Sequence, residues 1–291
     1  MRTVRVGLVQ VRVDGDVGVR LPARLAHLDA LVAGVRPGEL DLLCFPEACA
    51  SPYLFADAAD ARRRAEPAEQ AAGAVDFFRR LAVRLCCGVA AGLITLRGDA
   101  APSARPRNVF VVVSPAGEVR VTRSKNLLYA TDKRWADEPR PDEAFAVVRL
   151  PWLGDVRAMF AVCNDINSRD ESDFEAYPLA SAAARDRAQL VVLLTAWCSQ
   201  GPTATAAEHD AAVEVDDQLD YWFARLRPLW GSGAHLVAAD RVGREPVPGA
   251  KDGARVHYCG SSCAVRLGTT ARVLGVLDAE SEGVLRVQLE V

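Results

Sequence analysis

VRAMFAVCND (156–165), ESDFEAYPLASAAARDR (171–187) and QLVVLLTAW (189–197) form the stretch of the chain that decides its fold. The first and third segments are short apolar runs, and each predicts a buried strand. The second segment is longer and amphipathic, which predicts a helix. A strand, a helix and a strand in this order indicate an α/β protein built in layers.

The same alternation continues toward both ends of the chain. Strands are expected at 4–13, 40–45, 87–96, 108–114, 119–124 and 235–243, and in CGSSCAVRL (259–267), TARVLGVL (270–277) and GVLRVQLEV (283–291), with helices at 20–35, 68–85 and 213–230. A polar, proline-rich loop is expected at 97–107, and the turn PAGE (115–118) makes a hairpin of the strands beside it. No step in composition marks a domain boundary. We therefore expect a single domain over residues 1–291 with mixed β-sheets.

The 291 residues carry a formal net charge of −3, and 50% of them are hydrophobic. This balance suits a globular core and gives no electrostatic reason to expect nucleic acid or an anionic membrane as a partner. No apolar run reaches the roughly 18 residues that cross a bilayer. The opening MRTVRVGLVQVRV alternates as a strand does and lacks the apolar core and cleavage site of a signal peptide. We therefore expect a cytoplasmic protein.

Eight cysteines raise the questions of disulfides and of metal binding. Most of them lie in or beside apolar segments, where cysteine is a small buried hydrophobe, and a reducing cytoplasm disfavours disulfides. Cys259 and Cys263 are four residues apart, but no second pair follows, and the four histidines are scattered. Structural zinc sites have a different spacing. We expect no metal and no organic cofactor.

Three polar residues follow strongly apolar strands, at the positions where ligand sites collect in layered α/β proteins. Glu47 follows DLLCFP, Lys125 follows VRVTRS, and Cys163 ends VRAMFAVC. Each has an ordinary interpretation by itself: a solvated carboxylate, a surface cation and a buried packing residue. Their combination is what indicates chemistry.

In this order the three residues resemble the Glu–Lys–Cys constellation of the nitrilase, or carbon–nitrogen hydrolase, superfamily. The resemblance rests on CFPEACASPY (44–53), SKNLLYATD (124–132) and VCNDIN (162–167). It extends over nearly the whole chain through RNVFVVVSPAGEV (107–119), AADRVGRE (238–245) and YCGSSCAVRLGTTARVLG (258–275), which are similar to the family's hairpin and closing segments. It implies a four-layer α-β-β-α sandwich of the nitrilase type with two mixed β-sheets.

A finer resemblance is to the branch of protein N-terminal asparagine/glutamine amidohydrolases. It rests on KNLLYATDKRWADE (125–138), CNDIN (163–167), LLTAWC (193–198) and LDYWFARLRPL (219–229). Other branches more often have Arg-Phe-Pro after the cysteine triplet, where this chain has Ile166, Asn167 and Ser168. It also departs from the N-terminal branch, because Ser168 replaces a proline and the segment 168–177 is unusually charged.

The resemblance assigns roles that fit the chemistry of amide hydrolysis. Cysteine thiolate is a strong nucleophile, but a free thiol titrates near 8.5 and needs a base. Glu47 would take the proton of Cys163 and later give one to the departing ammonia. Lys125 would place a positive charge where the oxyanion of the tetrahedral intermediate develops. A thioester would form and then be hydrolysed.

Further site residues follow from the resemblance with alternatives left open. The family's second glutamate is assigned to Glu138, with Asp132 and Glu143 as alternatives. Asp165 or Asp132 would bind the α-ammonium of an N-terminal residue, and Asp165 could equally hold its own loop through backbone hydrogen bonds. Aromatic residues would form the pocket walls, or simply pack in the core: Tyr129, Trp135 and Trp197.

Three functions remain open at this point. The first is deamidation of N-terminal Asn and Gln to Asp and Glu in peptides or proteins. The second is hydrolysis of a small carboxamide, an N-carbamoyl amine or a nitrile by the same chemistry. The third is a catalytically silent scaffold of the same fold. The family resemblance also makes a homodimer possible, paired through the helix expected at 171–187.

Overall fold

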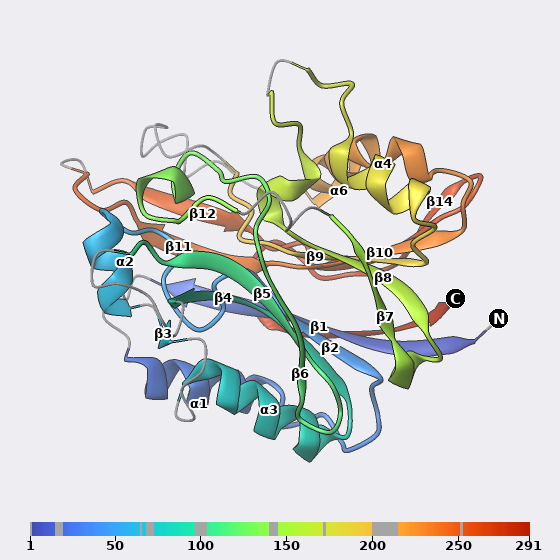
Figure 1. Cartoon of the computed structure of the whole chain (residues 1–291), viewed down its shortest axis with the longest axis horizontal. Coiled ribbons are helices and arrows are strands. Elements are labelled where there is room, and N and C mark those ends of the chain that lie inside the picture. The colour runs from blue at the N-terminus through green and yellow to red at the C-terminus, as the bar shows by residue number, and fades with distance from the viewer. Residues whose placement is uncertain are drawn as a thin grey trace.

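The computed structural model describes residues 2–14, 20–64, 66–67, 73–96, 104–139, 145–170, 173–199, 215–250 and 253–291. Figure 1 shows four layers, in which two β-sheets lie face to face between two pairs of helices. One outer layer holds α1 (Leu21–Leu31) and α3 (Ala74–Leu85), and the other holds α4 (Pro178–Arg185) and α6 (Val215–Arg225). The expected α-β-β-α sandwich is confirmed.

The first sheet has nine strands within the described residues, in the order β12-β11-β1-β2-β4-β5-β6, with β15 paired to β1 and β3 to β4. The bounds are β1 (Thr3–Asp14), β2 (Leu42–Phe45), β3 (Glu66–Pro67), β4 (Gly88–Leu96), β5 (Arg107–Val113), β6 (Val119–Ser124), β11 (Arg241–Pro246), β12 (Arg255–Cys259) and β15 (Gly283–Glu290). Strands β1, β2 and β4 run parallel, whereas β4, β5 and β6 are antiparallel. The sheet is therefore mixed.

The second sheet has six strands within the same part of the chain, in the order β14-β13-β10-β9-β8-β7. The bounds are β7 (Val147–Leu150), β8 (Val156–Val162), β9 (Leu190–Leu194), β10 (Ala234–Ala239), β13 (Cys263–Leu267) and β14 (Ala271–Val276). Its centre is parallel, because β9 pairs with β8 on one side and with β10 on the other in that sense. The strand–helix–strand stretch that opened the sequence analysis is β8, α4 and β9.

Short helical elements complete the chain. They are α2 (Ala58–Arg64) and the 3₁₀ turns η1 (Asp132–Arg134), η3 (Pro151–Leu153), η4 (Cys163–Ile166) and η5 (Arg227–Leu229). Of these, η1 and η4 follow β6 and β8 and carry residues of the site described below. No helix in the described part of the chain is both long and apolar enough to cross a membrane.

The main core lies between the two sheets. Strand residues of alternate positions point inward from both sheets, as the period-2 geometry of strands requires. Phe110 of β5 stacks on Phe160 of β8 with ring centroids 5.5 Å apart, which joins the two sheets directly. Separate apolar clusters fill the spaces under α1 and α3 and under α4 and α6.

Two expected strands are in fact divided between the sheets. The run 235–243 contains the end of β10 and the start of β11, with Asp240 between them. The run 259–267 is divided in the same way by residues 260–262, where Gly260 and Ser261 have φ of 58° and 56°. A fully buried strand looks the same in either sheet, so apolar patterning does not reveal the crossing.

The expected helices and strand ends differ from the structure at their boundaries. The helix expected at 20–35 ends at Leu31, and that expected at 171–187 begins at Pro178, which occupies the first helical turn. The strand expected at 156–165 stops at Val162. Strand β7 was not expected, because three of its four residues are not fully buried. Parts of four expectations lie outside the described residues: 68–72, 97–103, 171–172 and 213–214.

Candidate active site

Glu47 stands two residues after β2, and a tight local backbone places it. The next residue, Ala48, has φ of 48°, and the Glu47 N–H donates to the carbonyl of Thr195 at 3.3 Å. A Cβ on Gly92 of β4 would lie only 2.5 Å from the Cα of Glu47. The glycine therefore lets the neighbouring strand come close enough to hold the Glu47 loop against the sheet.

The Glu47 carboxylate is fully buried and lies among hydrogen-bond donors. Its Oε1 accepts from the Nζ of Lys125 at 2.8 Å and from the Nδ2 of Asn108 at 2.6 Å, and its Oε2 accepts from the Ala196 N–H at 3.0 Å. Burial raises the pKa of Glu47, an effect that the Lys125 charge opposes and the Asp132 charge reinforces. A carboxylate with a raised pKa is a stronger base than an exposed one.

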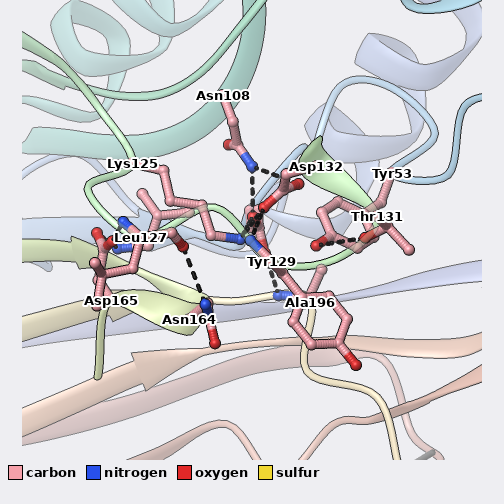
Figure 2. A network of polar contacts seen from close by, with 12 residues as sticks. Tyr53, Asn108, Lys125, Leu127, Tyr129, Thr131, Asp132, Asn164, Asp165 and Ala196 are labelled. Atoms are coloured by element: carbon pink, nitrogen blue, oxygen red, sulfur yellow. Dashed lines mark hydrogen bonds and ion pairs between the residues drawn. The ribbon is translucent and has the colours of Figure 1, made fainter. Parts of the chain in front are cut away.

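Lys125 follows β6 and lies between two carboxylates. Figure 2 shows its side chain directed toward Asp132, with Asn108 approaching the same carboxylate. The Lys125 Nζ is 2.6 Å from Asp132 Oδ2 in addition to its contact with Glu47, and it lies 5.6 Å from the centre of the Tyr53 ring. Burial works to lower the pKa of Lys125, but the two carboxylates outweigh it and raise the pKa well above its ordinary value. Lys125 is therefore a permanent buried cation.

Cys163 is the first residue of η4, immediately after β8. Its φ of 45° lies in the left-handed region, which non-glycine residues adopt mainly where the surrounding structure imposes it. Burial raises the pKa of the Cys163 thiol well above its ordinary value, and the Glu47 charge raises it further, whereas Lys125 lowers it. Contacts with the Thr195 hydroxyl and the Ala196 N–H also lower it. The thiol, the carboxyl and the ammonium thus lie in one electrostatic environment.

Asp165 joins the cysteine segment to the lysine segment. Its Oδ1 accepts from the N–H groups of Asn126 and Leu127, both at 2.7 Å, and its Oδ2 accepts from the Val162 N–H at 2.9 Å. Burial raises its pKa to about 7, although these backbone donors act in the opposite direction. All of these contacts are to backbone, which supports the loop-holding interpretation of Asp165 over ammonium binding.

A pocket of about 100 Å³ opens over Cys163. The described residues that line it are Tyr53, Tyr129, Cys163, Asn164, Asn167, Ala196, Trp197 and Cys198. Tyr129 and Trp197, two of the three aromatic residues suggested by the resemblance, are among these lining residues. Asp132 and Asp165 are fully buried behind the lining, and Trp135 is buried with its ring edge-on to Phe55 at 5.1 Å.

The second acidic partner of Lys125, besides Glu47, is Asp132, one of the alternatives considered for the family's second acid. Glu138, the preferred candidate, is exposed. The other alternative, Glu143, lies outside the described residues. In the described part of the chain, no three His, Cys, Asp or Glu side chains are grouped so that they could hold a metal ion.

The family model of carbon–nitrogen hydrolases matches residues 5–171, more than half of the chain. The chain belongs to the carbon–nitrogen hydrolase family. The match includes Glu47, Lys125, Asp132 and Cys163.

Relatives of this carbon–nitrogen hydrolase resemble it over most of its length. The protein N-terminal amidase of Schizosaccharomyces pombe is 26% identical over 266 residues, which cover 86% of this chain and 87% of the relative. A crystal structure of an N-terminal amidase with an Asn-Glu-Ala peptide has a TM-score of 0.79 at 15% identity, covering 99% and 98% of the two chains. An amidase from Nesterenkonia sp. AN1, a mutant with acrylamide added at its active site cysteine, has a TM-score of 0.68 at 19% identity and coverage of 99% and 93%.

Several site residues of this carbon–nitrogen hydrolase were not identified from the sequence. Asn108 lies inside a strand and looked like a hairpin residue, yet its Nδ2 contacts both Glu47 and Asp132, the latter at 3.4 Å. Tyr53 and Thr195 likewise lie within or beside apolar segments. A buried polar residue at the end of a strand was the only signal, because such residues need a partner inside the protein.

Proposed function

We propose that this chain hydrolyses the side-chain amide of an N-terminal Asn or Gln residue and releases ammonia, with Cys163 as the nucleophile. The observation that carries the proposal is the burial of Lys125 and Glu47 in contact with each other beneath a pocket that Cys163 lines. The names of the relatives support the substrate class, since the similar proteins include N-terminal amidases.

The first step is attack on the amide carbon. Glu47 takes the proton of the Cys163 thiol as the sulfur forms a bond to the carboxamide carbon, and the carbonyl electrons move to oxygen. Two of the three N–H donors of Lys125 meet Glu47 and Asp132, which leaves the third for this oxyanion. Loss of one such donor typically costs about 10²–10³ in rate.

The second step breaks the carbon–nitrogen bond. Glu47 returns its proton to the nitrogen, which leaves as ammonia, and the acyl group remains on Cys163 as a thioester. Glu47 then removes a proton from a water molecule that attacks the thioester carbon. The carbon–sulfur bond breaks, the sulfur regains a proton, and the side chain leaves as a carboxylic acid.

Asp132 has a different role in this proposal. It contacts the Lys125 Nζ at 2.6 Å and accepts the Tyr129 N–H at 2.9 Å, so it holds the cation and the pocket wall in place. A second carboxylate beside Lys125 also keeps the ammonium charged while Glu47 gains and loses its proton. We therefore assign the family's second acidic position to Asp132 and not to Glu138.

The direct test is ammonia release from peptides that begin with Asn or Gln. We expect both ammonia and the matching acid from these peptides, far less of either from N-acetylated versions, and none from a Cys163→Ala variant. Turnover of the acetylated peptides at the same rate would contradict the requirement for a free N-terminus. The Cys163→Ser variant is a matched control, because it keeps the size of the side chain but lowers its nucleophilicity.

A second candidate is hydrolysis of a small carboxamide, an N-carbamoyl amine or a nitrile. It is favoured by the likeness to the Nesterenkonia amidase, a double mutant of which has a solved structure in complex with acrylamide, a small carboxamide. Ammonia from such a compound, with none from the Asn and Gln peptides, would establish this candidate. A silent scaffold would show neither reaction, and its Cys163 would react with iodoacetamide no faster than an ordinary thiol.

We further propose a cytoplasmic enzyme that pairs with a second copy through the helical layer of α4. All eight cysteines are free thiols, which suits a reducing compartment. Phe174 and Trp230, near this layer, are 48% and 53% exposed, and large exposed apolar side chains are common at interfaces. Measurement of the mass in solution tests the pairing, and a monomer at every concentration would exclude it.

A further inference from the structure

The pocket lacks a negatively charged wall wherever the structure describes it. None of its described lining residues is acidic. The nearby carboxylates are occupied: Glu47 and Asp132 contact Lys125, and Asp165 accepts backbone N–H groups. A substrate ammonium inside the pocket therefore meets amide oxygens and aromatic rings. The inference that follows rests on the proposed function, in which the substrate carries such an ammonium.

Two asparagines of the wall form a chain of hydrogen bonds with a single direction. The Leu127 carbonyl can only accept, so Asn164 turns its Nδ2 toward it at 3.2 Å (Figure 2). The Asn164 Oδ1 then accepts from the Nδ2 of Asn167 at 2.9 Å. This fixes the other amide as well, because it leaves the Asn167 Oδ1 to accept from the Tyr221 hydroxyl at 2.7 Å.

This chain of hydrogen bonds, which joins Asn164, Asn167 and Tyr221 and is called the relay below, presents acceptors to the pocket. Each amide oxygen has two lone pairs, and each oxygen of the relay accepts one hydrogen bond from its neighbour in the chain. The remaining lone pair of each is available to an ammonium donor. The Trp197 ring, which also lines the pocket, lies 5.4 Å from the Tyr221 ring and gives the cation an aromatic face.

Neutral acceptors also suit the chemistry of the thiol. The Glu47 charge already raises the pKa of Cys163, and another carboxylate in the pocket wall would raise it further. When Glu47 and Asp132 are both ionised, two negative charges lie beside one positive charge, Lys125. The excess negative charge behind the wall attracts a cation without direct contact.

We propose that Asn164 and Asn167 bind the α-ammonium of the substrate through their side-chain oxygens, and that Tyr221 of α6 is a positioning residue that fixes their orientation. The pocket thus selects a primary ammonium next to the carboxamide by neutral dipoles. Asn167 and Asn164 act on substrate selection, whereas Glu47, Lys125 and Cys163 act on the amide.

The test compares two peptides that differ only at the N-terminus: one begins with Asn, and the other carries the same carboxamide with hydrogen in place of the ammonium. We expect Asn167→Leu to lower kcat/KM for the Asn peptide roughly 10- to 100-fold, mainly through KM, because a hydrogen bond to a charged group is lost. The peptide without the ammonium should keep its rate. Tyr221→Phe, which removes only one oxygen atom, should shift the ratio of the two rates in the same direction by a smaller factor.

Tyr177→Phe is the control, since the Tyr177 hydroxyl donates to Glu175 outside the relay. It should leave the ratio unchanged. Equal loss on both peptides, or no change in the ratio for either relay variant, would overturn the inference while ammonia release by the unaltered enzyme keeps the proposed function. If the unaltered enzyme releases no ammonia from the Asn peptide, the proposed function fails and the inferred ammonium site fails with it.

Discussion

At the scale of single residues, the site depends on charges that are buried together. Removing an ion from water is costly, and the cost is met here because Lys125 has two carboxylate partners and Glu47 has three donors. The arrangement leaves Cys163 as the neutral member of the group. In the mechanism that we propose, the raised pKa of Cys163 means that the sulfur becomes nucleophilic only when Glu47 takes its proton.

Replacement of Glu47 by Gln separates the role of Glu47 as a base from the effect of its charge on the pKa of Cys163. Turnover should fall about 10²- to 10⁴-fold, because the base is lost. At the same time the Cys163 thiol should react with iodoacetamide at lower pH, since the Glu47 charge that raises its pKa is gone. The measurements are kcat/KM and the pH midpoint of alkylation.

Glu118→Gln, at an exposed position, is the matched control for both measurements. An unchanged alkylation midpoint in Glu47→Gln would show that the Glu47 charge does not act on the thiol, and a higher midpoint would show that Glu47 assists ionisation of the thiol instead of opposing it. The alkylation readout remains informative even if the new amide is poorly accommodated beside the Ala196 N–H, a group that needs an acceptor.

At the scale of elements, the site is assembled where strands end. Glu47 follows β2, Lys125 follows β6 and Cys163 follows β8, so the two sheets each contribute residues from one edge of the sandwich. The strands themselves mainly hold these residues rigidly and pack closely against the loops that carry them. Gly92 of β4 is the point where close approach is most demanding, since its neighbours are backbone atoms that cannot turn away.

Gly92→Ala should therefore disable the site without breaking the sheet. The new Cβ would lie 2.5 Å from the Glu47 Cα and 2.8 Å from the Pro46 carbonyl oxygen, which forces the Glu47 loop to move. A displacement of about 1 Å can cost roughly 10²-fold in rate. We expect that loss in kcat/KM with an unchanged far-UV circular dichroism spectrum. Gly283→Ala, with no atom within 4 Å of the added carbon, should keep full activity; equal activity in both variants would refute the argument.

Asp165 gives a pH-dependent prediction, because its hydrogen bonds join η4 to the residues after Lys125. Its folded pKa of about 7 is above its ordinary value of 3.8, so between these values the folded state binds more protons than the unfolded state. The free energy of unfolding therefore falls as the pH rises through this window. Asp165→Asn lacks this ionisation and loses one acceptor, at a cost of about 1–3 kcal/mol.

Between pH 5 and pH 8, the free energy of unfolding of the natural chain should therefore exceed that of Asp165→Asn by the largest amount at pH 5 and by a smaller amount at pH 8. Urea unfolding of both chains across this range measures it. An advantage that grows with pH would mean that the backbone donors outweigh burial and that the carboxylate is the stable form. Asp186→Asn, at an exposed ion pair with Arg185, should change stability little at any pH.

These elements also show what could be read from the sequence. Glu47, Lys125 and Cys163 each follow a strand and have an ordinary interpretation alone, and they became candidates because their order resembles the family's Glu–Lys–Cys constellation. The alternation of strands and helices predicted a layered α/β protein, and the resemblance implied its four layers. Asn108 was not identifiable, because its partners come from 61 and 24 residues away in the chain. Asp132 and Glu138 could not be ranked either, since local sequence does not determine which loop carboxylate folds back onto the lysine.

At the scale of the whole molecule, the chain passes repeatedly from one sheet to the other. It leaves the first sheet after β6, returns with β11 and β12, and ends in the first sheet with β15, which pairs along β1. Figure 1 shows the two ends of the chain close to the same side of the sandwich. Neither sheet is therefore a continuous segment that could fold by itself, and we propose that residues 1–291 form a single domain.

Phe110→Ala, a change in the core between the sheets, tests whether the two sheets unfold together as a single domain. The Phe110 ring is 2% exposed and stacks on Phe160 of the other sheet, so its removal should lower the free energy of unfolding by about 3–5 kcal/mol. Because both sheets share this core, circular dichroism and tryptophan fluorescence should follow one transition that shifts as a whole. Val83→Ala, at a side chain that is 53% exposed, should shift neither signal by much. If the tryptophan fluorescence kept its original transition while the circular dichroism changed, the two sheets would be separate units.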